Sequence, residues 1–234
     1  NMSKTICGYN LFNINIIKSN IKDIYFEDNI IKVGSGLMLS ALDNIALKKN
    51  ICNFNFLRTI PGSVGGALIM NASFLGETIS DSLLEIEGFD YMNRYIKLKK
   101  EDIIFSYRYS NIKEILKIVT YAYFKSNYAD KREIEERIIT AYNYRKKQPN
   151  IKYTLGSAFK NKKDIKAYEL IQNVDKYEYK TFKVNKIHKN FLEFVPNSKG
   201  YEIRNDLLSF KNNVETSSGE SLEFEIQSLY DIYK

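Results

Sequence analysis

Residues 60–76 read IPGSVGGALIMNASFLG and hold four of the 11 glycines in this 234-residue chain. Glycine is used where φ is positive or where another group must approach the backbone closely. Pro61 and Gly62 are typical of a turn, and Ser63 stands where a helix could begin. Bare amides at such a loop-to-helix junction can bind an anion such as a phosphate. A tight turn between two closely packed elements explains the same glycines, so this stretch alone leaves both interpretations open.

The composition indicates a folded, basic protein. Hydrophobic residues make up 44% of the chain, and 35 Lys and Arg against 28 Asp and Glu give a net charge of +7. This charge favours nucleic acid, an anionic surface or a phosphorylated small molecule as ligand. Cys7, Cys52 and the single His188 are too few for a disulfide framework or a histidine-based metal site. With no apolar run of membrane-spanning length and no signal peptide, we expect a cytoplasmic protein with no membrane partner and no metal.

The hydrophobic pattern predicts two regions of interleaved strands and helices, an α/β or α+β arrangement. Pro149 ends the clearest predicted helix and marks the expected boundary, which gives domains 1–148 and 149–234. In the first domain we expect a hairpin at 25–33, helices at 37–49 and 129–148, and strands at 83–89, 95–98 and 115–124. In the second we expect helices at 164–174 and 203–214, extended chain at 181–195 and a closing strand at 221–229.

Three further stretches hold residue types suited to chemistry. In FSYRYS (105–110), Arg108 lies between aromatic residues, as a guanidinium held against a carboxylate or enolate would. In RKKQPNIKYTLGSAFKN (145–161), Gly156 allows close approach and Ser157 presents a hydroxyl beside a lysine and an amide. Taken alone, the first stretch fits an edge strand with an exposed Arg better, and an ordinary surface turn with a solvated basic run also explains the second.

The third stretch is Glu223-Phe224-Glu225. Alternate side chains of a strand share a face, so Glu223 and Glu225 are predicted to point the same way. One of these carboxylates is a candidate acid or base, although two solvated glutamates would give the same pattern.

Taken in this order, the four stretches resemble the UDP-N-acetylenolpyruvoylglucosamine reductase family. The pattern of that family has PG[ST]VGGA leading to MNAG.YG, then YR.S, GS.FKNP and a late LE.EV. The chain has IPGSVGGALIMNASFLG, YRYS, GSAFKN and LEFEI, and KIHKNF at 186–191 is similar to the family's KHA.F segment. The resemblance runs from about residue 30 to 229.

The resemblance implies an α+β fold with an FAD-binding domain of the PCMH/VAO type, followed by a smaller α+β substrate-binding domain. It implies an FAD-dependent reductase that uses NADPH to convert UDP-N-acetylglucosamine enolpyruvate to UDP-N-acetylmuramate in peptidoglycan precursor synthesis. The expected partner is therefore a small UDP-sugar and not nucleic acid, and we expect a monomer.

The resemblance also assigns roles to residues. It places Arg108 on the enolate with help from Glu225, and makes Ser157 the proton donor; we add Lys160 as an electrostatic aid to Ser157. Backbone donors to FAD would come from the glycine segment, and substrate contacts from five polar side chains. The FAD-binding set is Asn10, Pro61, Gly62, Ser63, Gly65, Gly66 and Asn71, and the substrate-binding set is Tyr107, Lys147, Lys160, Asn161 and Asn190, with Lys147 suited to the diphosphate.

The chain departs from the family pattern at several points. Only about 59 residues precede Ile60, so most of the family's first FAD lobe is expected to be missing, and CGYNL at 7–11 is interpreted as a remnant of its GGGSN-type stretch. NASFLG replaces NAGAYG, which puts Ser73 where a glycine is expected. Two alternatives stay open: an FAD-deficient descendant or fragment that keeps the scaffold and UDP-sugar binding, and a Tyr-rich nucleic-acid binder supported by charge alone.

Overall fold

The computed structural model describes residues 5–6, 17–171 and 177–228 of the chain. The described residues form two compact units: the first is Ile17–Lys146, and the second holds the described residues from Lys147 onward together with Thr5–Ile6. Each unit has a hydrophobic core of its own. Within the described ranges, no helix combines the length and the apolar character needed to cross a membrane.

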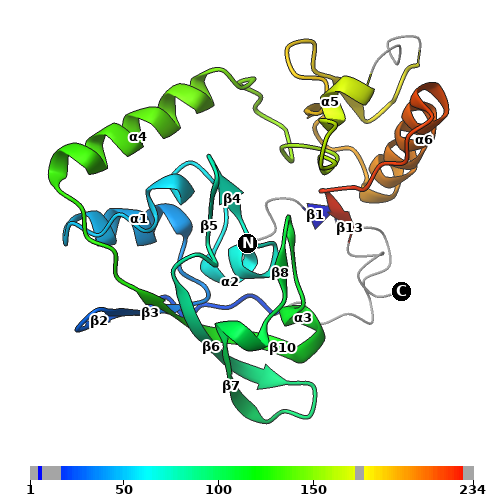
Figure 1. Cartoon of the computed structure of the whole chain (residues 1–234). Helices are drawn as coiled ribbons and strands as arrows, with labels where there is room; N and C mark the ends of the chain where they lie inside the picture. Colours follow the sequence, from blue (N-terminus) through cyan, green and yellow to red (C-terminus); the bar gives the residue numbers. More distant parts are fainter. Residues whose placement is uncertain (1–4, 7–16, 172–176, 229–234) are drawn as a thin grey trace. The chain divides into compact units, whose positions relative to one another are not determined.

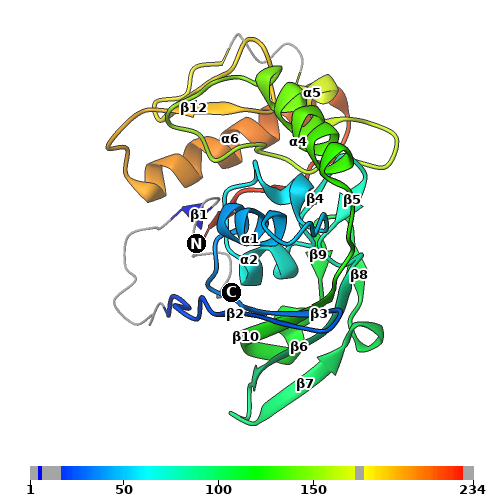
Figure 2. The ribbon, with the colours of Figure 1, turned by 90° about the vertical axis from the view of Figure 1, so that its left-hand side faces the viewer.

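The first unit is built on a five-stranded antiparallel sheet with the strand order β2-β3-β10-β6-β7. Its side chains alternate between a buried and a more exposed face, as in a sheet covered on one side. Ala122 and Phe124 of β10 lie opposite Val33 and Ile31 of β3, and all four are fully buried. Helices α1 (Leu39–Leu47) and α2 (Val64–Ile69) cover this face (Figures 1 and 2). The strands are β2 (Ile24–Glu27), β3 (Ile30–Gly34), β6 (Leu83–Asp90), β7 (Tyr95–Lys99) and β10 (Leu116–Lys125).

Short helices and two small hairpins complete this unit. The α-helices are α1 (Leu39–Leu47), α2 (Val64–Ile69), α3 (Ile112–Ile115) and α4 (Lys131–Lys146), and the 3-10 helices are η1 (Asn55–Leu57) and η2 (Lys100–Asp102). One hairpin pairs β4 (Ser73–Phe74) with β5 (Glu77–Thr78), and the other pairs β8 (Phe105–Ser106) with β9 (Tyr109–Ser110). Buried Asp43 of α1 accepts hydrogen bonds from Asn55 Nδ2 (2.7 Å) and Arg58 Nη1 (2.6 Å), which fixes η1 against α1.

The second unit packs short strands and loops around one long helix, α6 (Gly200–Ser218). Its core is aromatic: Phe159 stacks on Phe224 with ring centroids 4.9 Å apart, and Phe182 and Phe210 are fully buried beside them. Strands β11 (Phe182–Val184) and β12 (Leu192–Phe194) pair antiparallel, β1 (Thr5–Ile6) pairs parallel with β13 (Gln227–Ser228), and α5 (Ala167–Leu170) is a single turn.

Most predicted elements of the first unit are confirmed, and the mixed helix and strand content is that of an α+β protein. The hairpin at 25–33 turns at Asp28, whose φ is +49°, and the predicted helices and strands are present with shifted ends. The second unit differs more. Only 167–170 is helical within 164–174, of which 172–174 lie outside the described residues, and 181–195 holds two short strands.

The closing strand predicted at 221–229 is wrong for most of its length. Of the described residues in this stretch, which end at Ser228, only Gln227–Ser228 is strand, and Phe224 makes an isolated bridge to Phe159. Leu222, Glu225 and Ile226 are all buried, so the alternation of buried and exposed residues breaks between 224 and 226. The reason is that the N–H groups of Glu225 and Ile226 both donate to the Ala158 carbonyl, at 2.8 and 3.4 Å, which bends the chain out of a regular strand.

Candidate active site

The glycine segment begins α2 at Val64, and it is bonded to the turn that follows β3. The Leu39 N–H donates to the Gly62 carbonyl (3.0 Å), and the Val64 N–H donates to the Leu37 carbonyl (2.9 Å). A Cβ on Gly65 would lie 3.1 Å from the Ser35 Cβ and 3.3 Å from the Ser35 carbonyl oxygen. Close packing between two elements therefore accounts for Gly65.

Some backbone N–H groups of this segment are hydrogen-bonded within the protein, and others are not. The Gly65 N–H donates to the Ser35 carbonyl at 2.8 Å, so the donation to FAD predicted for this amide is corrected: it is already used inside the protein. Among the described residues, the N–H groups of Gly62, Ser63 and Gly66 have no hydrogen-bond partner, and Gly66 is exposed. Three unused donors at the start of a helix fit an anionic group such as a pyrophosphate.

Asn71, which follows the C-terminal end of α2, has an unused acceptor. It is buried with a φ of +41°, and its Nδ2 donates to the Ser106 carbonyl at 3.1 Å. Its Oδ1 has no partner within the described part of the chain. A buried polar atom without a partner costs free energy, so a ligand that donates to it is the expected compensation. These residues therefore fit the polar edge of a cofactor.

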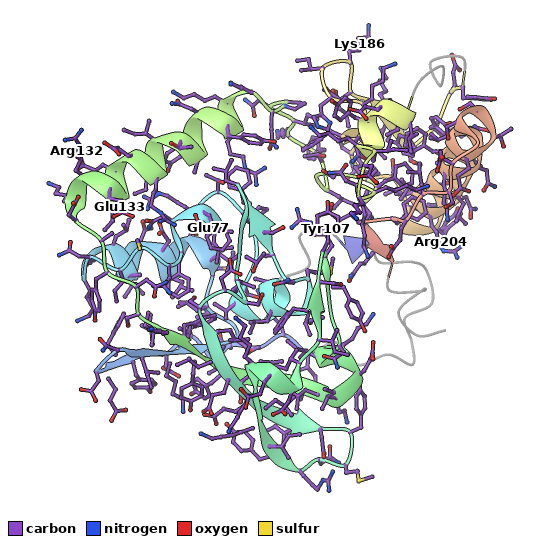
Figure 3. All side chains as sticks on the ribbon, viewed as in Figure 1. Glu77, Tyr107, Arg132, Glu133, Lys186 and Arg204 are labelled. Carbon is purple, nitrogen blue, oxygen red and sulfur yellow. The ribbon has the colours of Figure 1, made fainter. Side chains whose placement is uncertain are left out.

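Arg108 lies at the tip of the β8–β9 hairpin, where Figure 3 also places Tyr107. Its φ of +55° is unusual for a residue other than glycine. The guanidinium donates from Nη1 to the Ser73 carbonyl (3.2 Å) and to Ser73 Oγ (3.1 Å), and it lies 5.5 Å from the Tyr107 ring centroid. The Ser110 hydroxyl donates to the Ile69 carbonyl (3.0 Å), so the hairpin is tied to the end of α2.

A second arginine lies near Arg108, and the sequence analysis did not single it out. Arg145, in the last turn of α4, donates from Nε to Thr59 Oγ1 (3.1 Å), with its guanidinium 5.0 Å from the Phe74 ring centroid. Burial and the positive charge of Arg108 lower the pKa of Arg145. Two guanidinium groups close enough to interact in a partly buried region favour binding of a carboxylate or phosphate.

In the second unit, the segment that holds Ser157 is hydrogen-bonded to the segment that holds Glu225. Gly156 has a φ of +77°, and after it Ser157 makes an isolated bridge to Phe191. The Ala158 N–H donates to the Asn190 carbonyl, and the Glu225 N–H donates to the Ala158 carbonyl, both at 2.8 Å. Ser157 thus directly precedes the residue to which buried Glu225 is hydrogen-bonded.

Asn190 and Lys160 have partners within this segment. Asn190 is buried, with Nδ2 donating to the Phe159 carbonyl and Oδ1 accepting from the Phe159 N–H, both at 2.9 Å. Its side chain thus shapes the segment around Ser157, and the substrate contact stays a prediction. Lys160 forms an ion pair with Glu223, which offsets the charge that was expected to assist Ser157.

The expectation that Glu223 and Glu225 point the same way is wrong. The Glu223 side chain is 72% exposed, whereas Glu225 is 6% exposed, because the segment is not a regular strand. The two carboxylates therefore have different surroundings, and Glu225 is the buried candidate.

Most of the other predicted site residues are exposed to solvent. Asn161 is exposed, and its Oδ1 accepts from the Ala167 N–H (3.0 Å) at the start of α5. Lys147 is exposed as well, as are Pro61 and Tyr107, and Asn10 lies outside the described residues. Arg108 belongs to the first unit, and Ser157 and Glu225 belong to the second.

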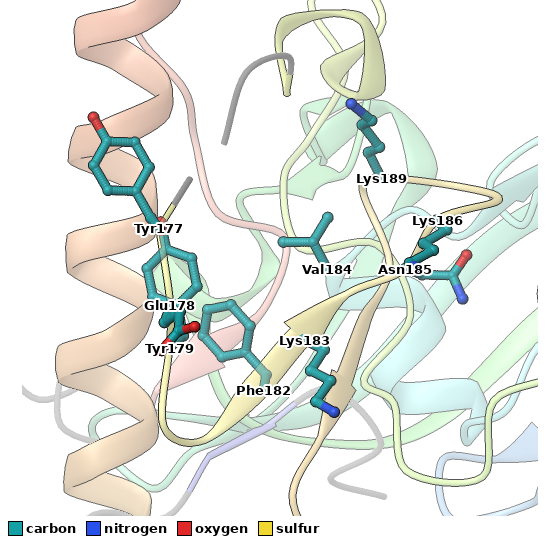
Figure 4. Close-up of a pocket in the computed structure, with 9 residues that line it drawn as sticks. All are labelled: Tyr177, Glu178, Tyr179, Phe182, Lys183, Val184, Asn185, Lys186 and Lys189. Atoms are coloured by element: carbon teal, nitrogen blue, oxygen red, sulfur yellow. The ribbon is translucent and has the colours of Figure 1, made fainter. Parts of the chain in front are cut away.

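A pocket of about 760 Å³ lies elsewhere in the second unit, against the segment that precedes β11 (Figure 4). Tyr177 and Tyr179 lie along α6 on one side of it, and Lys186 and Lys189 on the other. None of the predicted site residues lines this pocket.

The relatives and the solved structure that resemble this chain carry the same family name. No family model matches the chain. A UDP-N-acetylenolpyruvoylglucosamine reductase of Rickettsia massiliae is 32% identical over 214 residues, which cover 90% of this chain and 72% of the relative. A protein of the same name from Pelagibacter ubique is 33% identical over 230 residues, or 95% of this chain and 72% of the relative. A crystal structure of the Thermus caldophilus reductase aligns with a TM-score of 0.72 at 27% identity, over 84% of this chain and 71% of that one.

Proposed function

Because the chain belongs to the UDP-N-acetylenolpyruvoylglucosamine reductase family, we propose that it reduces UDP-N-acetylglucosamine enolpyruvate to UDP-N-acetylmuramate for peptidoglycan synthesis. We assign the first unit to FAD, as a domain of the PCMH/VAO type, and the second unit to the UDP-sugar. When bound, FAD would accept a hydride from NADPH and supply it to the enolpyruvyl double bond. One observation carries this proposal: the hairpin that presents Arg108 is hydrogen-bonded to the glycine segment, in which the N–H groups of Gly62, Ser63 and Gly66 have no partner among the described residues.

Charge development in the substrate determines what Arg108 must do. If the hydride adds to the methylene carbon of the enolpyruvyl group, negative charge appears on the carbon next to the carboxylate and spreads into it as an enolate. A fixed guanidinium stabilises this charge more than it stabilises the neutral double bond, which lowers the barrier. Glu225, which belongs to the second unit, is assigned the assisting role that the family resemblance implies.

The second half of the addition needs a proton on the carbon that carries the charge. We assign this proton to the Ser157 hydroxyl, because its backbone is fixed between the Gly156 turn and the Asn190 contact. Positioned proton donors typically contribute about 10²–10⁴-fold to a rate. Lys147 and Asn161 would contact the diphosphate and the rest of the UDP-sugar, and Gly62, Ser63, Gly66 and Asn71 would hold the cofactor.

The proposal is tested by flavin retention and turnover. The purified protein is incubated with FAD, desalted and examined for a visible flavin spectrum, and is then mixed anaerobically with NADPH and with the enolpyruvyl substrate. We expect retained flavin, bleaching by NADPH, recovery of colour on adding substrate, and UDP-N-acetylmuramate by mass spectrometry. A colourless protein that still binds UDP-N-acetylglucosamine in calorimetry would instead establish the FAD-deficient alternative.

A further inference from the structure

We propose that Ser73 is a positioning residue for Arg108, an inference that rests on the proposed function for its catalytic consequence. Ser73 occupies the position where the family pattern has glycine. Its hydroxyl accepts a hydrogen bond from Arg108 Nη1 at 3.1 Å, and its carbonyl accepts from the same nitrogen at 3.2 Å. Two acceptors of one residue therefore hold one end of the guanidinium.

The hairpin that carries Ser73 is connected to helix α4 by an ion pair. Ser73 pairs with Thr78 in the β4–β5 hairpin, and the neighbouring Glu77 forms an ion pair with Arg137 of α4. Arg137 also approaches Glu133 of the same helix, at 3.6 Å. Figure 3 labels Glu77 and Glu133, which lie near each other between the hairpin and α4. The acceptors are thus fixed to a helix and do not depend on a free loop.

Arg108 itself needs such support. It has a strained positive φ at the tip of a hairpin whose strands are two residues long. The positive charge of Arg145 interacts unfavourably with it. Repulsion between like charges and a long, flexible side chain both favour alternative rotamers for Arg108. A hydroxyl dipole that accepts from Nη1 opposes this tendency, and a glycine at position 73 would offer Arg108 the backbone carbonyl without the hydroxyl.

The test uses Ser73→Ala, which removes only the hydroxyl oxygen, and Ser73→Thr, which keeps it and suits a strand. Ser40→Ala serves as the control, because Ser40 is an exposed serine of the same unit and its hydroxyl makes no hydrogen bond in the described structure. The first readout needs neither cofactor nor substrate: the rate at which phenylglyoxal modifies Arg108, followed by peptide mass spectrometry. Arg58, which is paired with buried Asp43, is the internal reference.

The second readout is the single-turnover rate of substrate reduction, compared with the rate of flavin reduction by NADPH. In Ser73→Ala we expect Arg108 to be modified about threefold faster, and substrate reduction to be about five- to tenfold slower, as for loss of one half-exposed hydrogen bond to a charged group. Flavin reduction should be unchanged. Ser73→Thr should restore both readouts, and Ser40→Ala should match the unmodified protein.

The outcomes separate this inference from the proposed function. If the unmodified protein does not reduce the substrate, the proposed function fails, and with it the catalytic consequence assigned to Ser73. If the protein is active but Ser73→Ala leaves either readout unchanged, the positioning role is overturned. A loss that Ser73→Thr does not restore overturns it as well, because the hydroxyl would then not be the cause.

Discussion

Ser157 is held by backbone contacts on both sides, and its hydroxyl is the group assigned to deliver the proton. The Gly156 N–H donates to Thr154 Oγ1 at 3.1 Å, and the Ala158 N–H is bound to Asn190. We expect Ser157→Ala to slow substrate reduction by about 10²–10⁴-fold. Flavin reduction by NADPH should change far less, because it requires no proton from this serine. Stopped-flow absorbance of the two half-reactions measures both rates.

Equal losses in the two half-reactions would contradict this assignment, as would an unchanged rate of substrate reduction. Thermal unfolding supplies the control. Ser157 contributes no hydrogen bond from its side chain in the described structure, so the melting temperature of Ser157→Ala should stay close to that of the unmodified protein.

Gly65 and Gly66 are neighbours that should respond differently to the same substitution. A Cβ on Gly65 meets Ser35, which is buried and cannot yield: its N–H donates to the Thr120 carbonyl at 2.8 Å, and its hydroxyl bonds to Ser19 at 2.8 Å. A Cβ on Gly66 has its nearest contact at 3.7 Å, which is ordinary packing. We expect Gly65→Ala to lower the free energy of unfolding by about 1–3 kcal/mol.

Gly66→Ala is the matched comparison, and we expect it to be neutral or stabilising by up to about 1 kcal/mol, because alanine favours a helix. Urea unfolding of both variants measures the difference. If the two substitutions cost the same, close packing against Ser35 is not the reason for Gly65.

Among the elements, the turn between β6 and β7 is organised by one carboxylate. Asp90 Oδ1 accepts from the N–H groups of Met92 (2.8 Å) and Arg94 (2.9 Å), and Oδ2 accepts from Arg94 Nε at 2.7 Å. The Arg94 backbone N–H, the Arg94 side chain and the Met92 N–H hold the pKa of Asp90 below its ordinary value. A carboxylate whose pKa is lowered by folding stabilises the protein above its unfolded pKa, and this contribution is lost as the pH falls through the folded value.

Asp90→Asn should therefore lower the melting temperature at pH 7, and the difference from the unmodified protein should shrink as the pH falls below about 4. Melting curves from pH 3 to pH 7 measure this. Arg94→Gln, which removes the side-chain partner and leaves the two backbone contacts, should give a smaller change. A difference that stays constant across this range would show that the Asp90 charge is not what stabilises the turn.

Elements that depend on local contacts could be predicted from the sequence, and elements that depend on distant contacts could not. The hairpin at 25–33 and the helix at 129–148 were found because their turn residues and hydrophobic periods are local properties. The prediction of a strand at 221–229 was wrong because Phe224 packs on Phe159 and Glu225 bonds to Ala158. The hydrophobic periodicity of this segment gives no information about such contacts with distant residues. Element positions were thus predictable where each side chain's surroundings come from its own segment.

In the candidate site as well, local motifs could be recognised in the sequence, whereas contacts between distant residues could not. Arg108 and Ser157 could be proposed as site residues because each stands in a motif of a few consecutive residues. The contact between Ser73 and Arg108 joins positions 35 apart in the chain, so the sequence showed only that a glycine was replaced. Arg145 was missed because a basic residue in the last turn of a helix is common and gives no sign of its neighbours. The motif therefore locates the chemical groups, and the structure shows what holds them.

For the whole molecule, the proposal divides two ligands between two units, and this division can be tested without turnover. The N–H groups of Gly62, Ser63 and Gly66 are unused, so bound FAD should slow their hydrogen exchange, whereas the Gly65 N–H is already bonded and should change less. UDP alone should protect peptides of Lys147–Lys234, including the segment around Ser157, and should leave 62–66 unchanged. Hydrogen exchange of the full chain, with FAD, with UDP and with neither, measures this pattern by mass spectrometry. Protection by FAD that avoids 62–66, or protection by UDP confined to the first unit, would contradict the assignment. Because protection reports binding directly, the result holds whether or not the rate of turnover is measurable.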